Sequence, residues 1–221
     1  MVRRSFVLAV LLAPLLIAST ACGTSDTQRP PTTSVTPSTR ADGSVAISST
    51  PSSQWGELAS CPLHAATPAS GTPAPEKIDG VESFPIQSQK HKDGCIEYEV
   101  YPPIGGAHNG IWANCGFYTS PVPNEHAVHS MEHGGVWITF SPDLPQADLA
   151  KVIGAAEASR FVLASPYPNL GSPLILNAWT RQLRLDSASD PRFALFISRY
   201  VQGPQTPELG PPCWDGLGTP G

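Results

Sequence analysis

Residues 124–140 read NEHAVHSMEHGGVWITF, and the periodicity of this stretch changes once along its length. The first part has helical spacing, and Asn124 can cap the start of a short helix that runs to about His133. Gly134 and Gly135 are residues that end a helix. Residues 136–140 are apolar, β-branched or aromatic, which is typical of a buried strand. The stretch therefore predicts a helix and a core strand joined by a tight turn.

Helical and strand patterns alternate around this stretch. Residues 146–158 and 191–200 carry apolar residues at helical spacing, and Pro191 suits the first position of a helix. Strand patterns occupy residues 96–101 (IEYEVY), 161–164, 174–179 and 182–185. The sequence therefore predicts an α+β or α/β fold, in which a small mixed β-sheet is packed against about three helices.

The N-terminus has the three parts of a signal peptide, which we assign to residues 1–21. Arg3 and Arg4 supply positive charge, and residues 6–18 form an apolar run that is too short to span a roughly 30 Å hydrocarbon core comfortably as a helix. The small residues before Cys22 resemble a bacterial lipobox, although Ser19 replaces the common Leu. This resemblance predicts lipid on the Cys22 thiol and a lipid-anchored, extracytoplasmic protein, and the alternative is ordinary secretion.

The composition divides the rest of the chain into a tether, a domain and a tail. Ser, Thr and Pro dominate residues 23–53, which cannot bury enough apolar area to offset the entropy of ordering. We expect a disordered tether over residues 22–79, a globular domain over 80–203 and a Pro- and Gly-rich tail over 204–221.

The net charge bears on the class of partner. The formal charge is −5, and loss of Arg3 and Arg4 with the signal peptide gives −5 − 2 = −7. Nucleic acid requires a basic surface, so it is excluded as a partner. The predicted partner is the membrane, through the N-terminal lipid, and the sequence names no protein partner.

Four cysteines remain after Cys22: Cys61, Cys95, Cys115 and Cys213. An even number in an exported chain favours two disulfides. Three pairings are possible, and we favour Cys95–Cys115 with Cys61–Cys213, because Cys95 and Cys115 flank the same candidate site. The alternative role, as thiolate metal ligands, lacks a short C-x-x-C pair.

Three histidines lie on the predicted helix at residues 124–133. At about 100° per residue, the rings of His126, His129 and His133 share one stripe. Imidazole is a common ligand of zinc and copper, which makes the stripe a candidate metal site. The alternative is structural, with His133 stabilising the helix C-terminus and the other two rings facing water or the core.

Residues 129–133 also match the H-x-x-E-H motif of the inverted zinc peptidases. In that class the two histidines hold zinc and the glutamate activates water. His129, His133 and Glu132 would take these roles here, which gives a zinc-dependent hydrolase as an alternative function. Gly134 and Gly135 end the helix at once, whereas that class continues it.

A loop before the helix supplies a fourth histidine. Residues 102–108 read PPIGGAH and residues 112–118 read WANCGFY. The prolines stiffen the start of the loop and the glycines allow unusual dihedral angles, so the loop can present His108 over the helix. Trp112, Phe117 and Tyr118 could wall the site or pack in the core.

These two motifs, together with VHSMEHGGV at residues 128–136, resemble the bacterial family called domain of unknown function 3105 (DUF3105). Residues 176–179 and 183–186 are similar to its later strands, so the resemblance covers roughly residues 80–203. It implies a small exported or membrane-attached α/β domain without an established activity. The matching polar positions are His108, His129, Glu132 and His133, whereas His126 and Met131 are not expected in the family. Asn109 stands where the family commonly has Tyr.

The sequence leads to one principal hypothesis and two alternatives. The principal one is a lipid-tethered, non-enzymatic domain that binds copper or zinc through His108, His129 and His133, with His126 and Glu132 as further candidates. Because Glu132 lies about 80–100° from the rings, we expect it to support a ligand rather than to bind the ion. The alternatives are the hydrolase, with Glu132 as its general base, and a scaffold lipoprotein whose histidines are structural.

Overall fold

Strand β4 (Val136–Phe140) is an inner strand of the sheet in the computed structural model, which describes residues 39–40, 42–75, 78–85 and 88–221. Every residue of β4 is buried, as its β-branched and aromatic composition predicts. It pairs in parallel with β5 (Val162–Pro166) and antiparallel with β6 (Leu174–Ala178). The sheet is therefore mixed.

Shorter strands extend the sheet on both sides of this trio. Antiparallel to β6 lies β7 (Arg181–Leu185), and the remaining strands are β1 (Thr72–Pro73), β2 (Glu82–Ser83) and β3 (Gly116–Phe117). Within the described residues the order is β1-β2-β7-β6-β4-β5-β3. The parallel pairs lie at the β3 end and the antiparallel pairs at the β1 end.

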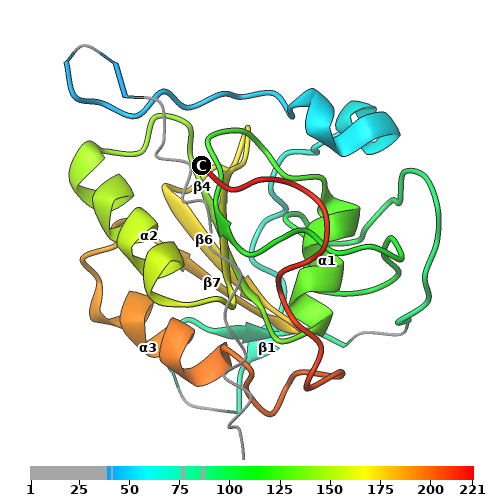
Figure 1. Ribbon diagram of the computed structural model, residues 1–221. Helices are drawn as coiled ribbons and strands as arrows, with labels where there is room; N and C mark the ends of the chain where they lie inside the picture. Colours follow the sequence, from blue (N-terminus) through cyan, green and yellow to red (C-terminus); the bar gives the residue numbers. More distant parts are fainter. Residues whose placement is uncertain (1–38, 41, 76–77, 86–87) are drawn as a thin grey trace, which may run out of the picture. The chain divides into compact units, whose positions relative to one another are not determined.

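The side chains of β4 alternate between two apolar cores, one on each face of the sheet. Ile138 and Phe140 belong to the core that includes α2 (Gln146–Ala158) and α3 (Pro191–Tyr200). Trp137 belongs to a second core, with residues of α1 (Asn124–Glu132). Figure 1 shows α2 and α3 on one side of the central strands and α1 on the other. The sheet is thus the middle of three layers.

Local signals fix where α1 and α3 begin or end. The carboxylate of Asp190 accepts a hydrogen bond from the Arg192 backbone N–H at 2.8 Å, just where Pro191 starts α3. After α1, Gly134 has a φ of 92°. A Cβ at Gly135 would lie 2.7 Å from the Ser130 carbonyl oxygen, so the tight return from α1 into β4 requires glycine there.

The predicted mixed sheet with helices packed on it is confirmed. Strand β4 and helices α2 and α3 have the predicted bounds. The strand predicted over residues 96–101 is wrong. Its backbone N–H groups find side-chain acceptors instead: Ile96 donates to the Glu125 carboxylate and Tyr98 to the Tyr101 hydroxyl, both at 2.9 Å.

Buried residues also occur outside the range 80–203. A 3-10 helix, η1 (Ser53–Ser60), lies within the range predicted as a tether and buries Trp55 and Leu58. The segment predicted as a tail, residues 204–221, runs beside β3, where the Gly221 N–H donates to the Phe117 carbonyl at 2.8 Å. Both segments lack a periodic pattern, and long-range bonds rather than local propensity hold them.

The N-terminal predictions fall on a different part of the chain. The predicted signal peptide, residues 1–21, and the lipidation site Cys22 lie outside the described residues. Among the residues that are described, no helix combines the length and the apolarity needed to cross a membrane.

Candidate metal centre

Four side chains that can bind a metal ion meet beside α1. They are His91, His108, His129 and Glu132, and their ligand atoms all lie within 4.8 Å of one another. His91 is exposed, whereas the other three are buried. The group therefore has three members inside the protein and one at its surface.

Helix α1 and the loop before it supply the buried members. His129 and Glu132 are three residues apart on α1, which makes them neighbours on the helix surface. His108 lies in the Gly-rich loop, residues 105–112, and its ring centroid is 4.7 Å from that of His129. The loop thus presents His108 to the helix, as the sequence predicts.

His91 comes from a third segment, and no motif in the sequence marks it. Two backbone hydrogen bonds join its neighbours to the loop: Lys92 N–H to the His108 carbonyl at 2.8 Å, and His108 N–H to the Lys90 carbonyl at 3.2 Å. They bring the His91 ring centroid within 5.1 Å of that of His108 and 5.0 Å of that of His129. Only this tertiary contact identifies His91, because its spacing from the other histidines matches no motif.

Backbone carbonyls of the loop fix the orientation of three imidazoles. The Nδ1 atoms of His108, His129 and His126 lie 2.8, 2.7 and 2.6 Å from the carbonyl oxygens of Gly106, Asn109 and Ile111. A carbonyl oxygen only accepts, so each Nδ1 carries the hydrogen and donates it. In the neutral ring the lone pair is then on Nε2, which is the atom left to bind a metal ion.

His108 and Glu132 form the closest pair in the group. Nε2 of His108 lies 2.8 Å from Oε2 of Glu132, and the two side chains are 0% and 6% exposed. At this distance a proton or a metal ion can lie between the two atoms. Because Nδ1 already donates to Gly106, a neutral His108 ring turns its Nε2 lone pair toward the carboxylate. A shared cation removes the repulsion, so the pair fits a metal ion.

The electrostatics keep His129 and Glu132 in the protonation states that a metal ion needs. Burial is the largest cause that lowers the pKa of His129 to about 4, and the nearby His133 and His108 act in the same direction. Burial would raise the pKa of Glu132, but His108 and the other imidazoles outweigh it and hold this pKa below its ordinary value. At neutral pH, His129 is neutral and Glu132 is ionised.

Two predicted candidates lie outside the group. The His133 ring centroid is 4.5 Å from that of His129, yet its Nδ1 donates to the Pro212 carbonyl at 2.8 Å and its Nε2 is not part of the group. His126 packs against Trp55, with ring centroids 5.6 Å apart. Glu132 was expected to support a ligand, but its carboxylate is itself a member of the ligand group. The reason is that His108 approaches α1 on the side where Glu132 lies.

This arrangement differs from the H-x-x-E-H zinc site. That site needs both motif histidines on the metal and the glutamate free to act on water. Here His129 and Glu132 share the ligand group and His133 does not. The geometry therefore gives no support to a hydrolase of that type.

The aromatic residues of the loop divide between the site and the core. The Trp112 ring packs against His129 and His133, with centroids 5.5 and 4.8 Å away. Phe117 stacks on Phe140 in the core of α2 and α3, and Tyr118 is buried in the core of α1. Trp112 is thus the aromatic wall of the site, and the other two are structural.

Two disulfides fasten the irregular segments that carry the site. They join Cys61 to Cys95, shortly after His91, and Cys115 to Cys213. The predicted pairs Cys95–Cys115 and Cys61–Cys213 are therefore wrong, because Cys95 pairs with the cysteine that follows η1 and Cys115 pairs with the C-terminal segment. All four cysteines are oxidised, which excludes them as thiolate ligands.

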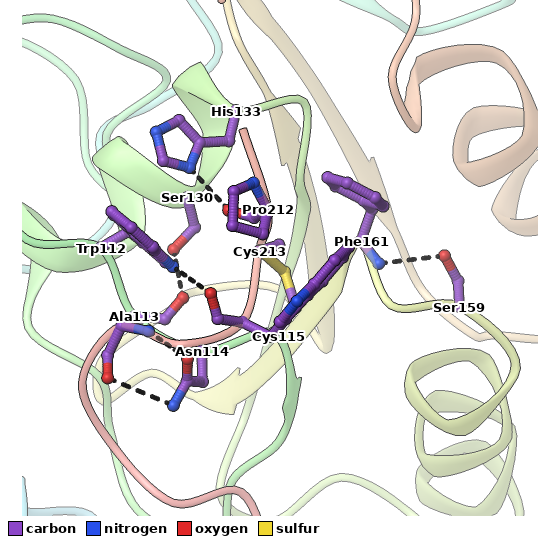
Figure 2. Close-up of a disulfide and its surroundings, with 12 residues drawn as sticks. Trp112, Ala113, Asn114, Cys115, Ser130, His133, Ser159, Phe161, Pro212 and Cys213 are labelled. Atoms are coloured by element: carbon purple, nitrogen blue, oxygen red, sulfur yellow. Dashed lines mark hydrogen bonds between the residues drawn. A yellow bond between two sulfur atoms is a disulfide. The ribbon is translucent and has the colours of Figure 1, made fainter. Parts of the chain in front are cut away.

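The second disulfide brings the C-terminal segment to the site. In Figure 2 the imidazole of His133 points to the Pro212 carbonyl, beside the Cys115–Cys213 bond. Nearby, the indole N–H of Trp112 donates to the Trp214 carbonyl at 3.1 Å. The C-terminal segment therefore orients both a histidine and the aromatic wall.

Comparison with known families supports the resemblance seen in the motifs. Residues 89–215, more than half of the chain, match the family described as "Protein of unknown function (DUF3105)". The chain belongs to the DUF3105 family. The DUF3105 match includes all four ligand residues of the group, and Cys61 lies outside it. No curated protein and no solved structure matches the chain.

Proposed function

We propose that this protein is an extracytoplasmic lipoprotein in which His91, His108, His129 and Glu132 hold one divalent transition-metal ion. The convergence of three imidazoles and one carboxylate within 4.8 Å carries the proposal. Backbone carbonyls already orient two of these imidazoles, so little side-chain freedom remains to be lost on binding.

The donor set favours zinc or copper(II). Imidazole nitrogen and carboxylate oxygen suit both ions, whereas copper(I) selects thiolate or thioether sulfur. Among the described residues no sulfur atom joins the group: Met131 is buried in the core of α1 and the four cysteines form disulfides.

The disulfides support a location outside the cytoplasm, because such bonds persist in oxidising compartments. Together with the signal-peptide pattern of residues 1–21, they support export and lipid attachment at Cys22. In cells that express the protein, labelled fatty acid should be incorporated into the wild-type chain and not into the Cys22→Ala variant. The Cys22→Ala variant should also be absent from the membrane fraction. Label retained by Cys22→Ala would show that Cys22 is not the site.

Metal affinity tests the site itself. The purified protein should bind one Zn²⁺ or Cu²⁺ per chain, and His129→Gln should weaken binding by at least about 100-fold, because a direct ligand is lost. His126→Gln is the matched control. His126 lies on the same helix, is 2% exposed against 3% for His129, and also donates its Nδ1 hydrogen to a loop carbonyl, but its ring is outside the group.

The two variants separate ligation from folding. If His126→Gln loses as much affinity as His129→Gln, helix damage rather than ligand loss explains both results. If the wild-type protein binds neither ion in equilibrium dialysis, the metal site is refuted and the scaffold role is left.

A further inference from the structure

His133 lies next to the ligand group without belonging to it, and its surroundings resemble those of a ligand. Its side chain is 3% exposed, and its Nδ1 donates to the Pro212 carbonyl at 2.8 Å. As for the group's own imidazoles, this bond leaves the lone pair on Nε2. The structure thus holds a fourth oriented imidazole beside the site.

The Nε2 atom of His133 faces a carboxylate at a spacing that suits an ion. Oε2 of Glu208 lies 3.9 Å away, which is too long for a hydrogen bond. Bonds of about 2.0–2.2 Å from a zinc ion to nitrogen and oxygen span this distance at an angle between tetrahedral and linear. The pair can therefore share one ion without a large movement of either side chain.

The pair connects solvent with the ligand group. The Glu208 side chain is 56% exposed, whereas the His133 ring is buried against His129, with centroids 4.5 Å apart. The Glu208 N–H also donates to the Glu132 carbonyl at 3.2 Å, which fixes the C-terminal segment beside α1. Trp112 packs on both His129 and His133, so one aromatic ring covers the region between the two imidazoles.

We infer that His133 and Glu208 form a second, transient metal position through which the ion passes between solvent and the group of His91, His108, His129 and Glu132. This inference rests on the proposed function. Two ligands bind an ion more weakly than four, so the pair captures the ion and passes it on. A position on the path lowers the barrier in both directions, so its loss changes rates and not the equilibrium.

The test compares rates with affinity in the purified protein. Zn²⁺ uptake is followed by stopped flow from a weak fluorescent zinc indicator, and Zn²⁺ release by transfer to excess chelator. Glu208→Gln should slow uptake and release by the same factor, about 10-fold or more, and leave the equilibrium affinity unchanged. Glu157→Gln, which removes the same charge from the exposed side of α2, should change neither rate.

A double-variant cycle separates an ion position from long-range attraction by charge. If His133 and Glu208 bind the same ion in transit, His133→Asn combined with Glu208→Gln slows release no more than either change alone. Slower uptake with normal release indicates attraction alone and overturns the inference. Unchanged uptake and release rates in the variants also overturn the inference. A loss of equilibrium affinity in His133→Asn with an unaltered melting temperature overturns it too, because His133 would then be a ligand of the group. These results presuppose Zn²⁺ binding by the wild type, whose absence refutes the proposed function instead.

Discussion

The two faces of the sheet are stabilised by different means. The helical face, formed by α2, α3 and their apolar core, consists of regular elements. The site face, formed by α1, residues 88–115 and residues 204–221, is largely irregular and depends on two disulfides and on histidine–carbonyl hydrogen bonds. The difference shows that a repeating apolar pattern is enough for a packed layer, whereas the site requires bonds between segments far apart in the chain.

Removal of a disulfide should cause the largest loss in the free energy of unfolding, because both disulfides stabilise the site face. The bond between Cys115 and Cys213 closes a sequence separation of 98, and that between Cys61 and Cys95 one of 34. Loop-closure entropy then predicts losses of about 5 and about 4 kcal/mol in the free energy of unfolding for the paired Cys→Ala variants. Urea unfolding measures both losses.

Both paired variants should also bind Zn²⁺ more weakly, because each frees a segment that carries or orients a site residue. A folded Cys115→Ala/Cys213→Ala variant with wild-type Zn²⁺ affinity would contradict this dependence of the site on its disulfides.

A core truncation should damage the helical face and spare the site. Phe196 of α3 is 0% exposed, so Phe196→Ala should lower the free energy of unfolding by about 3–5 kcal/mol. The Zn²⁺ affinity of the protein that remains folded should equal that of wild type. A parallel loss of affinity would show that the two faces are energetically coupled.

A single side chain that ties the loop to α1 should have a smaller effect. The Ser130 hydroxyl is buried and lies 2.7 Å from the Ala113 carbonyl oxygen. Ser130→Ala should lower the free energy of unfolding by about 1–2 kcal/mol, because a buried acceptor loses its donor. Ser189→Ala, on the exposed surface of the helical face, should stay within about 0.5 kcal/mol of wild type in the same urea titration.

The pH dependence contributed by His126 should be the smallest effect. Burial lowers the pKa of His126 below its ordinary value of about 6.5. Below pH 6.5 the unfolded state therefore binds more protons than the folded state, and the free energy of unfolding decreases as the pH falls. His126→Gln should show a shallower decrease between pH 7 and pH 5, and an identical slope would refute a neutral, buried His126.

This division between the faces also explains what could be predicted from the sequence. Strand β4 and helices α2 and α3 were predicted correctly, because their periodic patterns are local and their faces are apolar. The strand predicted at residues 96–101 failed because its alternation comes largely from Tyr and Glu, whose polar ends bond locally or, for Tyr98, to the Ala107 carbonyl of the loop. The two-residue strands β1, β2 and β3 are too short to show a period.

The site was predicted in part, for the same physical reason. His129 and Glu132 are helix neighbours, and His108 stands in a glycine-rich loop, so all three carry local signals. His91 and Glu208 reach the site only through long-range backbone contacts, and no spacing in the sequence encodes them. The disulfide pairing failed because closeness to a common site does not determine which of two neighbouring segments a cysteine faces.

The three loop carbonyls that hold the imidazoles of His108, His129 and His126 have a consequence for evolution and engineering. Main-chain oxygens are the same whatever side chain is attached, so exchanges at Ala107 or at the exposed Ile111 leave every acceptor in place. Deletion or insertion of one residue between Gly106 and Ile111 shifts the acceptors relative to α1. The length of this loop is therefore under stronger constraint than the identity of its side chains.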